Sequence, residues 1–64
     1  MKKRYEVGPL HGTEIYGRCT SKRAAEALAI QRAAQHKIEV CVCDLKTGSL
    51  LVYNPEWKTW VAED

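Results

Sequence analysis

The sequence contains no phenylalanine, no long apolar run and no glycine-rich loop, and each absence excludes a class of protein or a kind of site. Its apolar stretches are far shorter than the roughly 20 residues that a membrane-spanning helix requires, so we expect no contact with a membrane. The four glycines are isolated from one another, which removes the backbone loop that commonly cradles phosphate groups. Without phenylalanine, the aromatic residues available to the core are tyrosine and tryptophan.

Three cysteines and two histidines are enough ligands for a metal site, but their spacing does not indicate one. The three cysteines are an odd number, and no apolar N-terminal run resembles a signal peptide, so we expect a cytosolic protein with reduced thiols. Cys41 and Cys43 are separated by one residue, which is not the spacing of structural zinc ligands. His11 and His36 lie far apart in the sequence. We predict no metal and no cofactor.

The length of 64 residues limits the chain to a single domain over residues 1–64. A domain of this size buries only about 60% of the surface that its unfolded chain exposes, and a deep catalytic cleft would hollow out so small a core. No serine, cysteine or carboxylate motif has a recognisable catalytic spacing. We therefore predict that the protein is not an enzyme and that it acts through its surface.

Alternating β-branched and aromatic residues flank one alanine-rich segment. Thr20 or Ser21 offers a hydroxyl as the helix N-cap, and Gly48 and the Asn54–Pro55 pair mark turns. The pattern predicts a helix over 22–35 and strands over 2–7, 13–19, 38–45, 50–53 and 58–62. This order, β-β-α-β-β-β, predicts an α+β fold in which one helix packs on one face of a five-stranded antiparallel sheet.

The faces of these elements follow from periodicity. Helical spacing predicts that one side of the helix packs on the sheet through Ala24, Ala27, Leu28, Ile30 and Ala34. The other face of the sheet would be open to solvent or to a partner, with Tyr16, Tyr53, Trp57 and Trp60 as candidates for exposure there.

Charge is distributed unevenly, with eight basic and three acidic residues over 1–37 but two basic and five acidic residues over 38–64. Basic side chains neutralise phosphates and exposed aromatic rings stack on bases, so a nucleic-acid-binding module is one interpretation. The aromatic residues could instead complete the core, and a pI of 8.5 is below the value of about 9 typical of such modules. A protein–protein interface rich in tyrosine, tryptophan and arginine is the other interpretation.

The second half of the chain also resembles a known family. The segments from His36 to Gly48, 50–53 and Lys58-Thr59-Trp60-Val61 are similar to the C-terminal part of a small phage anti-CRISPR protein directed at type I-F systems. The resemblance covers roughly residues 20–62. Where that family has further basic residues on its helix, this chain has Glu26 and alanines.

The resemblance implies a five-stranded fold with one helix, and a protein that works in the cytoplasm of the host bacterium. It implies stoichiometric binding to the crRNA-guided Cascade complex, as a DNA mimic or a DNA-binding inhibitor, so that target DNA is no longer recognised. The expected contacts are Lys22, Arg23, Arg32, Tyr53 and Lys58. We expect a monomer or a weak dimer, and the alternative function is a small cytosolic nucleic-acid-binding β-sheet module.

Overall fold

The computed structural model describes residues 3–63 and confirms the predicted order of elements. The helix α1 spans Lys22–His36. The strands are β1 (Tyr5–Pro9), β2 (Gly17–Cys19), β3 (Val40–Asp44), β4 (Leu50–Asn54) and β5 (Thr59–Glu63). Together they form an α+β fold with one five-stranded antiparallel sheet and one helix. Among the described residues, no helix is both long and apolar enough to cross a membrane.

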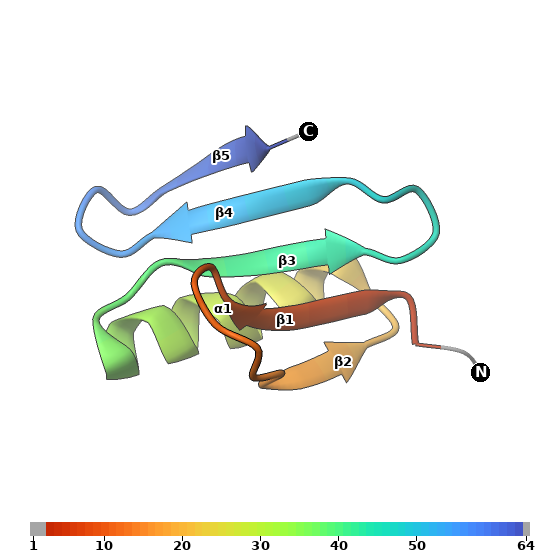
Figure 1. Cartoon of the computed structure of the whole chain (residues 1–64), viewed down its shortest axis with the longest axis horizontal. Coiled ribbons are helices and arrows are strands. Elements are labelled where there is room, and N and C mark those ends of the chain that lie inside the picture. The colour runs from red at the N-terminus through yellow and green to blue at the C-terminus, as the bar shows by residue number, and fades with distance from the viewer. Residues whose placement is uncertain (1–2, 64) are drawn as a thin grey trace.

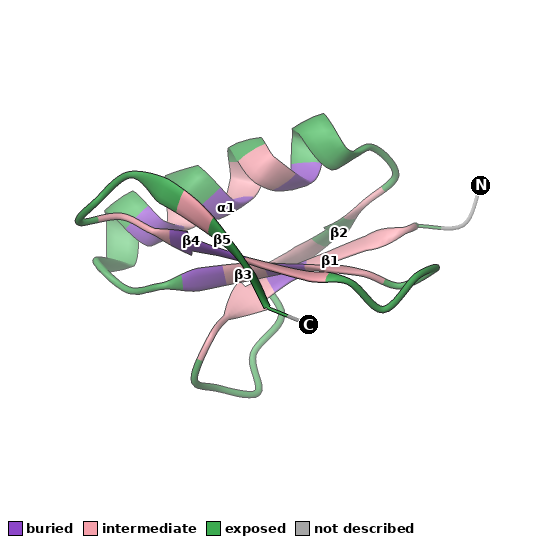
Figure 2. Ribbon diagram, turned by 90° about the horizontal axis from the view of Figure 1, so that it is seen from above, coloured by how far each residue is buried: buried purple, intermediate pink, exposed green. Residues whose placement is uncertain are grey.

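The strands lie side by side in the order β2-β1-β3-β4-β5, and every neighbouring pair is antiparallel (Figure 1). Because β1 is antiparallel to both of its neighbours, β2 and β3 run in the same direction with β1 between them. The helix joins these two parallel strands and lies across one face of the sheet (Figure 2). It packs on β1, β2, β3 and β4, and its backbone does not come close to β5.

The helix begins and ends at residues that satisfy its free backbone groups. The Ser21 hydroxyl accepts a hydrogen bond of 3.1 Å from the backbone N–H of Ala24, as an N-cap does. At the other end Lys37 adopts a left-handed conformation with φ 56°, and its N–H donates to the carbonyl oxygen of Ala33 over 2.8 Å. This geometry stops the helix at His36 without a glycine.

The buried side of the helix differs from the predicted one. Ala25, Ala29 and Ala33 are fully buried, whereas the sequence favoured a stripe made of Ala24, Ala27, Leu28, Ile30 and Ala34. Of that stripe only Leu28 packs against the core, from the flank, and the other four are exposed. The helix is rich in alanine, and no side of it is clearly more apolar than the others. The side that packs on the sheet is the one whose small side chains let the helix lie close to the strands.

Three aromatic residues predicted for the open face lie instead on the helix side. Tyr53 is 7% exposed and belongs to the core, where it pairs across the sheet with Val40 on β3 and with Trp60 on β5. Tyr16 stacks on the ring of His36 from the helix, with ring centroids 5.4 Å apart. The run Leu50-Leu51-Val52-Tyr53 is apolar at every position, so alternation did not reveal which residues face the helix.

Strand boundaries also differ from the predicted ones at the first hairpin. The predicted strand over 2–7 begins partly outside the described residues, and β1 continues through Gly8 and Pro9, where the sequence indicated a break. Odd-numbered residues of β1 direct their backbone groups toward the β2 side, since the Val7 carbonyl oxygen accepts from the Tyr16 N–H, whereas the Leu10 N–H donates to Glu39 on the β3 side. Pro9 has no N–H. A backbone N–H at this position would point past the end of β2, so the proline costs the sheet no hydrogen bond. The predicted second strand shortens to Gly17–Cys19.

The sheet face away from the helix is partly covered by the loop that joins β1 to β2 (Figure 2). A Cβ added at Gly8 would lie 2.6 Å from the Glu14 carbonyl oxygen, so this loop passes directly over β1. The Cys41 thiol donates to the Gly8 carbonyl oxygen over 3.4 Å. Burial raises the pKa of the Cys41 thiol, which keeps it protonated and consistent with its role as a small packing group.

Candidate partner-binding surface

One surface remains uncovered on the helix side, because the sheet is wider than the helix. We define the β5 ledge as the helix-side residues of β4 and β5 that solvent reaches, namely Leu51, Trp60 and Ala62, which lie beside the buried Tyr53. The ring centroids of Tyr53 and Trp60 lie 5.0 Å apart at a tilt of 53°. Tyr53 is buried, Leu51 and Trp60 are half-buried and Ala62 is exposed. The ledge is therefore an apolar strip that solvent still reaches.

Lys22 borders the ledge at the N-terminus of the helix. A hollow of about 470 Å³ lies there, with walls that include Lys22, Leu51 and Ala62. Lys22 and Arg23 are exposed, occupy the first turn, and make no ion pair among the described residues. Two cations at the positive end of the helix dipole destabilise the helix by about 0.3–1 kcal/mol each. No carboxylate in the first turn offsets them.

At the opposite end, the turn between β4 and β5 approaches the C-terminus of the helix. A second hollow of about 350 Å³ is bounded by the last turns of the helix, Lys37, Pro55 and Glu56. The turn is held by Asn54, whose Oδ1 accepts hydrogen bonds from the N–H groups of Glu56 (2.9 Å) and Trp57 (3.2 Å). Trp57 is 71% exposed, which makes it the most accessible aromatic side chain in the described part of the chain.

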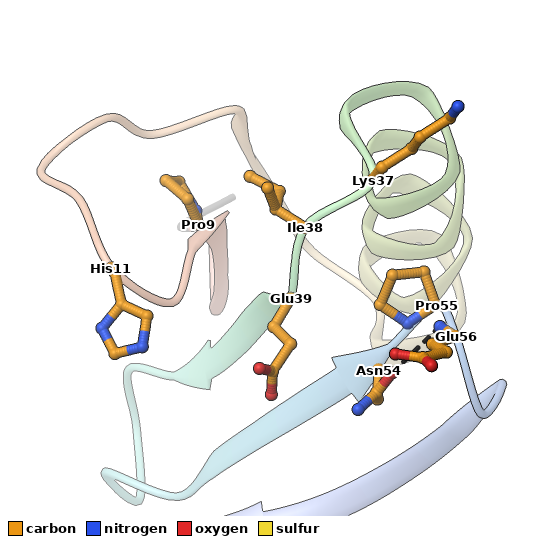
Figure 3. A pocket seen from close by; sticks show the side chains of 8 residues that line it. All are labelled: Pro9, His11, Lys37, Ile38, Glu39, Asn54, Pro55 and Glu56. Carbon is orange, nitrogen blue, oxygen red and sulfur yellow. Dashed lines mark hydrogen bonds between the residues drawn. The ribbon is translucent and has the colours of Figure 1, made fainter.

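A third hollow of about 350 Å³ opens where β1 ends and β3 begins (Figure 3). Its polar side chains are His11, Lys37, Glu39, Asn54 and Glu56. Lys37 points away from the opening, whereas Glu39 extends into it. Within residues 3–63, no three histidine, cysteine, aspartate or glutamate side chains gather closely enough to hold a metal ion. The mixed charge of this hollow does not favour one ligand class.

The structure brings two of the five predicted contact residues together and separates the rest. Lys22 and Arg23 share one helical turn. Lys58 lies beyond the far end of β4, a strand of five residues that spans roughly 17 Å, and has a left-handed backbone with φ 53°. Tyr53 is 7% exposed and belongs to the core, which leaves little of its side chain for a partner, and its role as a contact stays a prediction.

Arg32 occupies the other flank of the helix. Its guanidinium carbon lies 5.6 Å above the centre of the Tyr16 ring, and its Nη1 donates to the Gln35 side chain over 3.2 Å. The Arg32 Nε is buried without a hydrogen-bond partner. Arg32 is therefore a half-buried packing residue on the β2 side, away from the hollow that Lys22 borders.

Two further cations of the N-terminal half are neutralised within the fold. Arg4 and Asp44 form two parallel hydrogen bonds of 3.0 and 2.9 Å, and the Arg4 guanidinium holds the pKa of the Asp44 carboxyl well below its usual range. Arg18 pairs with Glu6 over 3.1 Å. Among the described residues, the exposed cations outside these two ion pairs are Lys22 and Arg23 at the start of the helix, Lys37 at its end, and Lys3, Lys46 and Lys58 outside it.

Sequence analysis did not identify the β5 ledge. Leu51 and Ala62 were not singled out because their importance depends on the helix leaving β5 uncovered, which no local pattern reveals. The fold is that of a small α+β domain, and no protein-family model, curated protein or solved structure matches this chain.

Proposed function

We propose that this protein acts by stoichiometric binding, as an anti-CRISPR inhibitor that attaches to a type I crRNA-guided Cascade complex and blocks recognition of target DNA. The observation that carries the proposal is the position of Lys22 and Arg23. Both are exposed in the first turn of the helix, where helix stability alone disfavours them, and Lys22 borders the apolar ledge. The choice of Cascade as the partner rests on the resemblance of the second half of the chain to type I-F inhibitors.

A surface of this kind suits a partner that carries both apolar and anionic groups. The ledge supplies apolar area through Leu51, Trp60 and Ala62, and Trp57 adds an exposed indole of the type that dominates interface hot spots. The cations at one end steer an anionic surface and fix its orientation. A complex that holds RNA and receives DNA presents such anionic groups next to protein.

The first test is a pull-down of purified type I Cascade complexes by the tagged protein, followed by competition with target DNA. We expect a saturable ratio of protein to complex and loss of DNA binding at saturation. The double variant Lys22→Glu/Arg23→Glu should weaken retention by at least tenfold. Lys3→Glu/Lys46→Glu is the matched control, because it makes the same change of charge at two exposed residues that lie outside the helix and do not line the hollow that Lys22 borders, and it should leave retention unchanged.

Circular dichroism and thermal unfolding verify that each variant folds. The proposal is wrong if the folded wild-type protein is retained by none of the type I complexes. It is also wrong if both double variants lose retention equally, because the effect would then depend on net charge rather than on Lys22 and Arg23.

The second candidate is a nucleic-acid-binding module, and the observation in its favour is the exposed Trp57 next to Lys58. An indole beside a cation suits base stacking and phosphate contact. The burial of Tyr53 and the stacking of Tyr16 on His36 leave fewer free rings than this candidate requires. A mobility-shift titration with bare DNA and RNA tests it. Binding that falls steeply with salt supports this candidate, and no shift at low salt eliminates it.

A further inference from the structure

The two edges of the sheet are protected to very different degrees. The edge strand β2 has three residues, including Gly17 and the charged Arg18, which pairs with Glu6. The other edge strand, β5, has five residues and reads Thr-Trp-Val-Ala-Glu. It contains no proline, no glycine and no lysine, and the helix does not cover it. Natural proteins usually shield an edge of this length, because its free backbone groups pair readily with another strand.

The hydrogen bonds of the sheet identify which backbone groups of β5 are free. The N–H of Asp44 donates to the Ser49 carbonyl oxygen, so residues 49, 51 and 53 direct their backbone groups toward β3. Successive residues point in opposite directions along a strand, so Leu50, Val52 and Asn54 direct theirs toward β5. Their partners on β5 are Glu63, Val61 and Thr59. The backbone groups of Trp60 and Ala62 therefore point outward.

We propose that β5 pairs with β5 of a second copy of this chain, in an antiparallel ladder whose two-fold axis passes beside Val61. In this register Trp60 lies opposite Ala62 of the partner copy, and Ala62 lies opposite Trp60 of the partner copy. Both pairs exchange their outward N–H and C=O groups, which gives four hydrogen bonds across the interface. The two five-stranded sheets become one sheet of ten strands, with both helices on the same face.

Side chains along β5 are complementary to themselves in this register. The large Trp60 is placed next to the small Ala62 of the partner copy, and Val61 meets its own counterpart. Thr59 lies opposite Glu63 of the partner copy. The strand also begins after a cation, Lys58, and ends with an acid, Glu63. Antiparallel pairing brings the cationic start of each strand toward the acidic end of the other, which favours this orientation over a parallel one.

The contact is small, because only one strand from each copy and its flanking side chains take part. Interfaces below about 1,200 Å² are typical of weak or transient association. We therefore expect a dimer that forms and dissociates with protein concentration over the range of about 10 µM to 1 mM. The β5 ledge would extend across the two-fold axis, since both copies present Trp60 on the helix side.

Sedimentation equilibrium over that concentration range is the primary test, and Ala62→Pro is the primary variant. Proline removes the outward N–H of Ala62, which β4 does not use, so the fold should persist. Two of the four intermolecular hydrogen bonds disappear, and we expect the dimer to weaken by at least about tenfold. Ala62→Ser retains the N–H and is the matched control, with a dimer close to that of the wild type. Thermal unfolding confirms that both variants fold.

A charge exchange at Val61 tests the register itself. Val61 is 51% exposed, so the fold tolerates a polar side chain there. Val61→Lys or Val61→Glu alone should weaken the dimer several-fold, because like charges then face each other across the axis. An equimolar mixture of the two variants should recover association. Only a register that places residue 61 opposite residue 61 predicts this recovery.

Three results would overturn the proposal. The first is a wild-type protein that stays monomeric throughout the concentration range. The second is association that continues beyond the dimer, which would indicate pairing of β5 with the β2 edge of another copy. The third is equal association by wild type and a folded Ala62→Pro. None of these results bears on retention of a Cascade complex by the helix cations, so this proposal and the proposed function fail separately.

Discussion

The Tyr53 ring and the Trp60 indole form a tilted pair with centroids 5.0 Å apart, and this pair connects the uncovered strand β5 to the core. Tyr53 belongs to the buried cluster, whereas Trp60 packs against that cluster while remaining partly exposed. Aromatic pairs of this geometry contribute about 0.5–1.5 kcal/mol beyond the area that they bury. The contact adds to the backbone pairing between β4 and β5, which holds β5 in the sheet.

Replacement of Tyr53 by alanine should destabilise the fold by about 3–5 kcal/mol, as for other large buried aromatic side chains. The Tyr53→Phe control should retain most of the stability, because it keeps the ring. Urea unfolding followed by circular dichroism measures both. Should Tyr53→Ala keep its unfolding midpoint and lose only partner binding, Tyr53 would be a surface contact after all.

The order and type of the elements could be predicted from the sequence because they depend on local signals. The β-branched and aromatic residues in 50–54 and 59–63, the turn at Gly48 and the cap at Ser21 each act over a few residues. Which residues of a strand face the helix could not be predicted from local signals of this kind. Leu50 to Tyr53 are apolar at every position, and the choice of side depends on pairing with Val40 and Trp60, which are distant in the sequence.

Ala29 lies at the centre of the buried stripe, so a larger side chain there has no space. Ala29→Leu should destabilise the protein by about 1–3 kcal/mol through overpacking against the sheet. Ala27→Leu places the same side chain on an exposed position of the same helix and should change stability by less than about 0.5 kcal/mol. Thermal unfolding of the pair checks the rotation of the helix, and equal losses would place the buried stripe elsewhere.

The candidate site was predictable only in part, for a related reason. Exposure of Lys22 and Arg23 follows from their place directly after the cap Ser21, and sequence reasoning identified both. Their distance from Lys58 depends on the length and direction of β4, and the engagement of Arg32 with Tyr16 depends on how the helix crosses β2. These are tertiary properties that no residue pattern within either element contains.

The ion pair between Arg4 and Asp44 predicts a specific dependence of stability on pH. The Arg4 guanidinium lowers the pKa of Asp44 in the folded state, while the unfolded chain has the usual value of about 3.9. The unfolded state then binds more protons at acid pH, so the contribution is complete above about pH 5 and is lost as the pH falls through the lower, folded pKa. Urea midpoints between pH 2 and 6 should show the wild type and Asp44→Asn converging toward low pH.

Arg4→Gln provides the matching experiment on the other partner of the pair. It should reduce the same acid-dependent contribution, and the double variant should lose little more than either single one, because the pair acts as a unit. High salt should reduce the effect, since the Arg4 side chain is 41% exposed. A difference between wild type and Asp44→Asn that stays constant down to pH 2 would contradict the prediction, because it would show that the stability does not depend on ionisation of Asp44.

Lys37 offers a substitution that should stabilise the fold. Its backbone is left-handed, with φ 56° and ψ 44°, a conformation that disfavours a residue with a Cβ by about 1 kcal/mol and that glycine adopts freely. Lys37→Gly should therefore raise the stability by about 0.5–1 kcal/mol, which corresponds to roughly 4 °C in the unfolding midpoint of so small a domain. Ala34→Gly, on an exposed position within the helix, should lower it by about 1 kcal/mol. Calorimetry measures the unfolding midpoint of each glycine variant. If both variants are less stable than the wild type, the helix continues through Lys37 and the prediction is wrong.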